Sequence, residues 1–193
     1  MKHVEGILKK FWQKYALLII VTAVIIVFDQ ATKLWITNNL ALGETYCIID
    51  GFCEQVRFLH WYNTGIAFGL FQGNSMLFSI TSIIIVVIIV IFYNQIPRQE
   101  WLLRLALAFE VGGALGNFID RVTLGHVTDF VAIGRFPIFN VADASINIGV
   151  ALMFLSIILE EIKDRRKKKA AELTSDESAP DISQEHEPEP DVE

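Results

Sequence analysis

Residues 76–93 have the sequence MLFSITSIIIVVIIVIFY and contain no charged side chain. At a rise of about 1.5 Å per residue, about 20 helical residues cross a hydrocarbon layer about 30 Å thick. Three other apolar stretches of comparable length occupy residues 15–36, 101–120 and 138–160. The chain, 53% hydrophobic over 193 residues, therefore predicts an all-α integral membrane protein with a bundle of four transmembrane helices.

The first apolar stretch differs from a cleavable secretory signal. Basic residues precede it, but the apolar run 16–28 is followed by Asp29-Gln30-Ala31-Thr32-Lys33, without a small-x-small cleavage site. The purely apolar part is too short to span a bilayer alone, so the helix must continue through Asp29 and Lys33. We predict an uncleaved membrane anchor.

Lys and Arg side chains gather in alternate connecting segments, and such residues are retained on the cytoplasmic side of a membrane. One group comprises Lys2, Lys9, Lys10, Lys14, Arg98, Lys163, Arg165, Arg166, Lys167, Lys168 and Lys169. The two remaining loops contain only Arg57, Arg121 and Arg135. This distribution predicts that both termini are cytoplasmic and that residues 37–75 and 121–137 lie outside.

The outer loop 37–75 has features of its own. Residues 54–62 mix β-branched and aromatic residues, with Val56, Phe58 and His60 on one face if extended, which favours a small extracytoplasmic β element. Cys47 and Cys53 lack nearby His partners and make a poor zinc site. They are able to form a small disulfide if the loop faces an oxidising compartment, and the sequence leaves this open.

The chain divides into a four-span membrane domain, residues 1–170, and a predicted disordered acidic cytoplasmic tail, residues 171–193. The tail is rich in Glu, Asp, Ser and Pro and has almost nothing to bury. It carries nine acidic residues and no Lys or Arg: Glu172, Asp176, Glu177, Asp181, Glu185, Glu187, Glu189, Asp191 and Glu193. The net charge of −6 therefore belongs to the tail, since the rest of the chain is slightly basic.

Charged side chains occur inside three of the four predicted spans, where a charge costs about 2.5–3.5 kcal/mol unless it faces the bundle and has a partner. Asp29 and Lys33 are four residues apart on one helix and are predicted to pair. Gly112 and Gly116 form a small-xxx-small surface that allows another helix to approach closely. The same span ends with Asn117, Asp120 and Arg121, whereas Glu110 lies deeper, and a Ser, Thr or Asn partner across the bundle is expected for it.

The fourth span has a polar stripe made by Asn140, Asp143 and Asn147. Asp129 precedes this span in a short loop and is able to fold back beside Asp143. Two carboxylates in one low-dielectric pocket do not both ionise easily, so one takes a proton. Such a pair is able to activate water and protonate a leaving amine, as in an aspartic protease. Paired carboxylates are equally typical of a proton- or cation-coupled carrier, and the pattern alone leaves both open.

Five motifs occur in order along residues 15–160. They are DQATK at 29–33, NTGIAF at 63–68, GGALGNFIDR at 112–121, VTDF at 127–130 and FNVAD at 139–143. Together they resemble the motifs of the lipoprotein signal peptidase (signal peptidase II) family. Thr128 and Ile66 are mild variants within these motifs.

The resemblance implies a bacterial cytoplasmic-membrane aspartic endopeptidase that removes signal peptides from diacylglyceryl-modified prolipoproteins, cutting just before the lipidated cysteine. The family's catalytic dyad falls on Asp129 and Asp143. Positions that line the site and hold the dyad or the substrate backbone fall on Asn117, Arg121 and Asn140. Further binding or supporting positions are Asp29, Lys33, Asn63, Gly65 and Asp120.

The resemblance implies neither a metal nor an organic cofactor. The expected partners are diacylated prolipoproteins, membrane phospholipid and inhibitors of the globomycin type, a cyclic peptide that occupies the substrate site. Membrane topology explains the basic clusters, so no nucleic-acid partner is expected. We expect a monomer whose active site faces the extracytoplasmic side.

Overall fold

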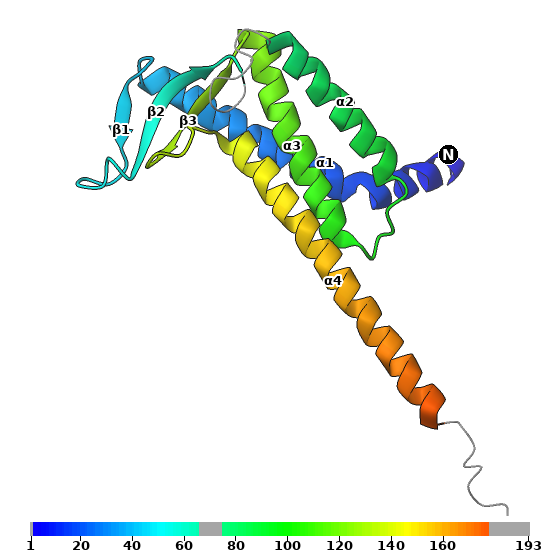
Figure 1. Cartoon of the computed structure of the whole chain (residues 1–193). Helices are drawn as coiled ribbons and strands as arrows, with labels where there is room; N and C mark the ends of the chain where they lie inside the picture. Colours follow the sequence, from blue (N-terminus) through cyan, green and yellow to red (C-terminus); the bar gives the residue numbers. More distant parts are fainter. Residues whose placement is uncertain (1, 66–74, 178–193) are drawn as a thin grey trace, which may run out of the picture. The chain divides into compact units, whose positions relative to one another are not determined.

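The computed structural model describes residues 2–65 and 75–177 (Figure 1). Its helices are α1 (Lys2–Asn39), α2 (Ser75–Tyr93), α3 (Trp101–Leu124) and α4 (Val141–Glu177). In this described part, four helices are long and apolar enough to cross a membrane. Strands β1 (Thr45–Cys47), β2 (Val56–Asn63) and β3 (Val127–Ile133) form one sheet. The predicted fold class, a four-helix membrane protein with a small β element, is confirmed.

The chain forms two compact units, Met1–Ser156 and Ile157–Glu193. The first contains α1 to α3, the sheet and the beginning of α4, whereas the described part of the second is the remainder of α4. Residues 171–177, predicted to be disordered from composition, are helical, so the prediction is wrong there. Residues 163–177 contain no Gly or Pro and consist largely of good helix formers, which explains the extension. The rest of the tail, 178–193, lies outside the described residues.

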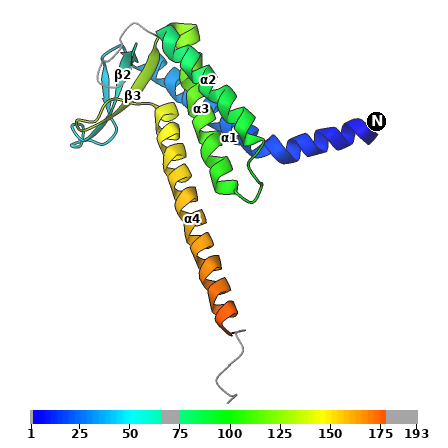
Figure 2. The same cartoon turned by 45° about the vertical axis from the view of Figure 1, so that its right-hand side comes forward.

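Helix α3 packs against both α1 and α2 (Figures 1 and 2). Its glycines permit close approach on two sides. A methyl group at Gly112 would lie 2.9 Å from Cβ of Ile25 in α1, and one at Gly113 would meet the carbonyl oxygen of Ala142 in α4. Gly112 of the predicted small-residue surface therefore faces α1. Its neighbour Gly113 faces α4, so two helices approach α3 closely here.

Arg104 joins three segments at the end of the bundle remote from the sheet. Its guanidinium donates to the carbonyl oxygens of Lys14 and Ile96 and lies 4.2 Å from the ring centroid of Tyr93. Tyr93 is fully buried and stacks on Tyr15 of α1. Hydrogen bonds and a cation–π contact thus compensate the charge of Arg104, which is itself buried, and hold α1, α2 and α3 together.

The sheet is antiparallel with the order β1-β2-β3. Strand β2 occurs where residues 54–62 favour one, but the register shifts between Phe58 and Trp61, so regular alternation of faces is broken. Strand β3 comes from residues 121–137, for which only a loop is predicted from the sequence. This strand is central to the site because it carries Asp129.

Two contacts attach the sheet and close its outer loop. Phe130 of β3 and Phe58 of β2 pack with Ile36 and Leu40 near the end of α1, so the sheet lies against that end of the helix. A disulfide joins Cys47 to Cys53 and closes the connection between β1 and β2. The structure therefore resolves the pairing that the sequence leaves open.

Candidate active site

Asp129, which is buried, and Asp143, which is half-buried, reach the same site from different elements, β3 and the first turn of α4. The side chain of Asn140 lies between them. Its Nδ2 donates to Oδ1 of Asp129 at 2.7 Å, while its backbone N–H donates to Oδ2 of Asp143 at 3.3 Å. One residue thus contacts both carboxylates, and the predicted convergence of Asp129 on the start of the fourth span is found in the structure.

Asn140 also begins α4. Its Oδ1 accepts the backbone N–H of Asp143 at 2.9 Å, which completes a reciprocal pair of bonds with Asp143. An N-terminal side chain that accepts from the third helical residue, while that residue's side chain accepts in return, is a capping box. The local sequence Asn140-Val141-Ala142-Asp143 therefore both starts the helix and orients a carboxylate.

Asn117 of α3 links Asp143 to the interior of the bundle. Its Nδ2 donates to Oδ1 of Asp143 at 2.8 Å. Its Oδ1 accepts from Asn140 Nδ2 at 3.1 Å and from Lys33 Nζ at 3.0 Å. Both ends of the amide are used, so its orientation is determined by its partners.

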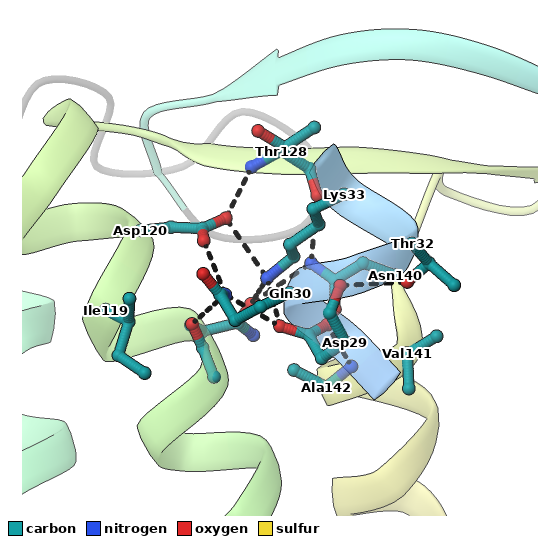
Figure 3. A network of polar contacts seen from close by, with 12 residues as sticks. Asp29, Gln30, Thr32, Lys33, Ile119, Asp120, Thr128, Asn140, Val141 and Ala142 are labelled. Atoms are coloured by element: carbon teal, nitrogen blue, oxygen red, sulfur yellow. Dashed lines mark hydrogen bonds and ion pairs between the residues drawn. The ribbon is translucent and has the colours of Figure 1, made fainter. Parts of the chain in front are cut away.

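Lys33 is the centre of a buried ion network (Figure 3). Its ammonium lies 2.8 Å from Oδ2 of Asp29 and 3.1 Å from Oδ2 of Asp120. The predicted pairing of Asp29 with Lys33 is confirmed, and Asp120 adds a second carboxylate from α3. Since all three side chains are buried, each charge is compensated by protein groups, as a buried charge requires.

The same carboxylates position the elements that carry the dyad. Oδ1 of Asp29 accepts the backbone N–H of Ala142 at 2.8 Å, at the N-terminus of α4. A carboxylate is favoured there because the first turn leaves N–H groups without helical partners. Oδ2 of Asp120 accepts the backbone N–H of Thr128 at 3.0 Å, directly before Asp129. Figure 3 shows these contacts converging between α1, α3, β3 and α4.

Gln30 is a member of the network that the sequence-based site prediction omits. Its Nε2 donates to Oδ1 of Asp120 at 2.9 Å and to the carbonyl oxygen of Gly116 at 3.2 Å. The available signal was its position inside the DQATK motif next to Asp29.

Asn63 and Gly65 reach the site from the end of β2. Nδ2 of Asn63 donates to Oδ2 of Asp129 at 2.9 Å, and its Oδ1 accepts the backbone N–H of Gly65 at 3.0 Å. Both oxygens of Asp129 therefore accept an amide hydrogen bond. Ile66, Ala67 and Phe68, the remainder of the NTGIAF motif, lie outside the described residues.

Arg121 is placed differently from the other predicted site residues. Its guanidinium lies 5.7 Å from the ring centroid of Phe78 in α2 and makes no hydrogen bond to Asp129 or Asp143 within the described residues. Its charge acts on both carboxylates through space. The side chain lines a groove of about 560 Å³ between α2 and α3, whose other walls are largely apolar.

Two further polar residues of the spans have other positions. Asn147 is exposed and donates from Nδ2 to the carbonyl oxygen of Asp143 at 2.9 Å. Glu110 is packed against Gly149 of α4, but among residues 2–65 and 75–177 it has no hydrogen bond or ion pair. The Ser, Thr or Asn partner expected for Glu110 is therefore not found in that part of the chain.

The environment of Asp129 changes its protonation. Burial, and next the negative charge of Asp143, raise the pKa of the Asp129 carboxyl from its ordinary 3.8 to about 7. Hydrogen bonds from Asn63 and Asn140 and the charge of Lys33 oppose this rise. Asp129 is therefore protonated in a substantial fraction of molecules at neutral pH, which an ordinary aspartate is not. Within the described residues, no group of three His, Cys, Asp or Glu side chains is placed to hold a metal ion.

Four long apolar helices, with a carboxylate pair at the edge of a small sheet, define a multi-pass membrane protein with a polar site. A model of the signal peptidase (SPase) II family matches residues 21–159. The chain belongs to the signal peptidase II family, a family of bacterial membrane peptidases.

Individual relatives agree with this membership. The lipoprotein signal peptidase of Shouchella clausii is 41% identical over 149 residues, which is 76% of this chain and 96% of that protein. That of Halalkalibacterium halodurans is 39% identical over 156 residues, with 78% and 97% covered. A bacterial membrane enzyme solved by the in meso method at 2.3 Å resolution has a TM-score of 0.68 at 34% identity, over 78% of this chain and 90% of that chain.

Proposed function

We propose that this protein is an intramembrane aspartic endopeptidase that removes signal peptides from prolipoproteins. Its substrates carry a diacylglyceryl group on a cysteine, and the cut falls just before that residue. Membership of the signal peptidase II family and the names of the relatives support the class of substrate. The adjacent carboxylates of Asp129 and Asp143 support the aspartic mechanism.

The observation that carries the mechanism is the pair of contacts made by Asn140. Its amide nitrogen donates to Asp129 and its backbone nitrogen donates to Asp143. The two carboxylates are thereby held beside one another, each with a separate set of amide donors. Hydrolysis of an amide needs both a base for water and an acid for the leaving amine, and such a pair supplies both.

In the proposed reaction, Asp129 carries the proton because its pKa is raised to about 7. Ionised Asp143 accepts a proton from a water molecule as the water oxygen bonds to the scissile carbonyl carbon. Asp129 donates its proton to the carbonyl oxygen. As the carbon–nitrogen bond breaks, Asp143 passes the proton taken from water to the amine nitrogen, and Asp129 takes a proton back from a hydroxyl of the intermediate. Asn117 and Asn140 hold the carboxylates, while the charge of Arg121 acts on both from the groove beside α2.

The remaining proposed properties concern place and partners. Both termini are cytoplasmic, and the site faces the extracytoplasmic side of the bacterial inner membrane. The concentration of Lys and Arg in the segments predicted to be cytoplasmic supports this orientation. The enzyme works as a monomer embedded in phospholipid and is inhibited by globomycin-type cyclic peptides.

The test is cleavage of a diacylated prolipoprotein by the purified protein in detergent or proteoliposomes. Asp129→Asn and Asp143→Asn are nearly isosteric changes that remove ionisation, and each should abolish cleavage. The double variant should be no worse than either single one, since the residues act as a unit. Asp164→Asn, a change on the exposed part of α4, is the matched control and should cleave normally.

An active Asp143→Asn enzyme contradicts the aspartic mechanism. A carrier is the other function compatible with intramembrane carboxylates. It would lose proton or cation flux in the same variants while lipoprotein processing continued, so flux measurements on the same proteoliposomes separate the two.

A further inference from the structure

The C-terminal part of α4 lies beyond the region that the family shares. The family match ends at residue 159, and the second compact unit, Ile157–Glu193, contains almost nothing of it. Residues 163–169 carry six Lys or Arg in seven positions and follow directly after the apolar run of the fourth span. The chemistry of the buried carboxylates makes no use of this segment.

Basic and apolar side chains share one face of this helix. Leu159, Ile162, Lys163, Arg166 and Lys167, here called the basic stripe, line a shallow groove of about 520 Å³. Their spacing of three and four residues places them on one side of the helix. Among the residues whose side chains the structure describes, no acidic one lines this groove.

Ion pairs compensate part of the charge on this helix. Nε of Arg165 lies 2.7 Å from Oε1 of Glu161, one turn before it. Within the stripe, Lys163 and Arg166 have no ion pair among the described residues, and Lys167 only approaches Asp164 at 3.9 Å. Lys168 and Lys169, outside the stripe, also have no ion pair among the described residues, so the stripe is distinguished by the apolar Leu159 and Ile162 beside the unpaired Lys163 and Arg166.

We propose that the basic stripe binds the headgroups of anionic phospholipids, with Leu159 and Ile162 beside the acyl chains. A cluster of Lys and Arg next to a membrane span attracts anionic lipid at about 1 kcal/mol per basic residue. Long basic side chains place their methylene groups on apolar surface and their charges at the headgroups. A single ligand with a phosphate beside an acyl chain matches both components of the stripe.

The chain's own acidic segment, residues 172–193, is the competing occupant. It also complements the charge, with nine carboxylates. Its composition is dominated by Glu, Asp, Ser and Pro, however, and it offers little apolar surface to cover Leu159 and Ile162. A lipid therefore fits the stripe better than the tail does.

The experiment is native mass spectrometry of the full chain, released from detergent that contains equal amounts of phosphatidylglycerol and phosphatidylcholine. A triple variant, Lys163→Gln/Arg166→Gln/Lys167→Gln, removes the charges of the stripe. The matched control, Arg165→Gln/Lys168→Gln/Lys169→Gln, changes the net charge equally but keeps the stripe. A third protein lacks residues 172–193.

The wild-type protein should retain phosphatidylglycerol in preference to phosphatidylcholine. The stripe variant should lose this preference, with an affinity lowered roughly a hundredfold, and the control should retain it. Retention by the stripe variant, or equal loss in both triple variants, overturns the proposal. A tenfold gain of phosphatidylglycerol on deleting residues 172–193 also overturns it, because the tail then occupies the stripe. None of these outcomes depends on peptidase activity.

Discussion

Asn140 and Asp143 hydrogen-bond each other in both directions at the start of α4. The N–H of Asp143 donates to Oδ1 of Asn140 at 2.9 Å, and the N–H of Asn140 donates to Oδ2 of Asp143 at 3.3 Å. The side-chain Nδ2 of Asn140 donates to Oδ1 of Asp129. The start of a helix and the position of both carboxylates are consequently coupled through one side chain.

This coupling makes two substitutions of Asn140 informative. Asn140→Ala removes the cap and the donor, and we expect a stability loss of about 1 kcal/mol together with cleavage slowed roughly ten- to a hundredfold. Asn140→Asp keeps a capping oxygen but replaces the donor to Asp129 by another carboxylate. It should also melt at a lower temperature and cleave slowly, because a buried carboxylate then faces Oδ1 of Asp129 and Oδ1 of Asn117. Melting temperature and initial rate are the two measurements, and a wild-type rate in both variants would remove Asn140 from the site.

The raised pKa of Asp129 predicts a pH dependence of stability. Between about pH 4 and 7 the folded protein keeps a proton on Asp129 that the unfolded chain has lost, because the ordinary pKa is 3.8 and the folded value about 7. Stability should therefore fall as pH rises through this window. Asp129→Asn should flatten that part of the profile, as measured by melting temperature against pH. An identical slope in the variant would contradict the assignment of the proton to Asp129.

The same proton predicts the alkaline limit of catalysis. Cleavage should decline as pH rises above about 7, since the acid of the pair is then lost. The apparent value measured from rates belongs to the two carboxylates together.

Lys33 compensates two buried carboxylates, so its removal should be severe. Lys33→Met leaves Asp29 and Asp120 unpaired in the bundle, and breaking a buried pair in this way costs about 3–5 kcal/mol. We expect little folded protein in the membrane fraction, and the protein that is recovered should have a lowered melting temperature in detergent. Arg165→Met breaks an exposed ion pair and should change stability by less than about 1 kcal/mol. Adding Asp120→Asn to Lys33→Met should recover part of the loss.

Gly113 predicts a packing defect that involves the site. A methyl group there would meet the carbonyl oxygen of Ala142 and lie 2.7 Å from Cγ1 of Ile146, so α4 must move away from α3. Gly113→Ala should lower both the melting temperature and the rate, because Asp143 moves with α4. Gly6→Ala, where nothing lies within 4 Å of the added methyl, should leave both unchanged. Normal cleavage by Gly113→Ala would show that α4 tolerates the shift.

Features that depend on the spacing of nearby residues were predictable from the sequence. The four spans follow from runs of apolar residues long enough for a bilayer, and the pairing of Asp29 with Lys33 follows from their separation by one helical turn. The proximity of Asp129 and Asp143 was predicted from their positions in the VTDF and FNVAD motifs. Composition misjudged the end of α4, because residues 171–177 are good helix formers as well as polar.

Contacts that join distant segments became visible with the three-dimensional structure. Asp120 meets Lys33, Gln30 and the backbone of Thr128, and Arg121 lies over Phe78 instead of contacting the dyad. Strand β3, which carries Asp129, was not predicted, since its partner is β2 more than sixty residues earlier. A hydrogen-bond partner across the bundle depends on helix packing and sheet register, and neither is encoded in the spacing of neighbouring residues.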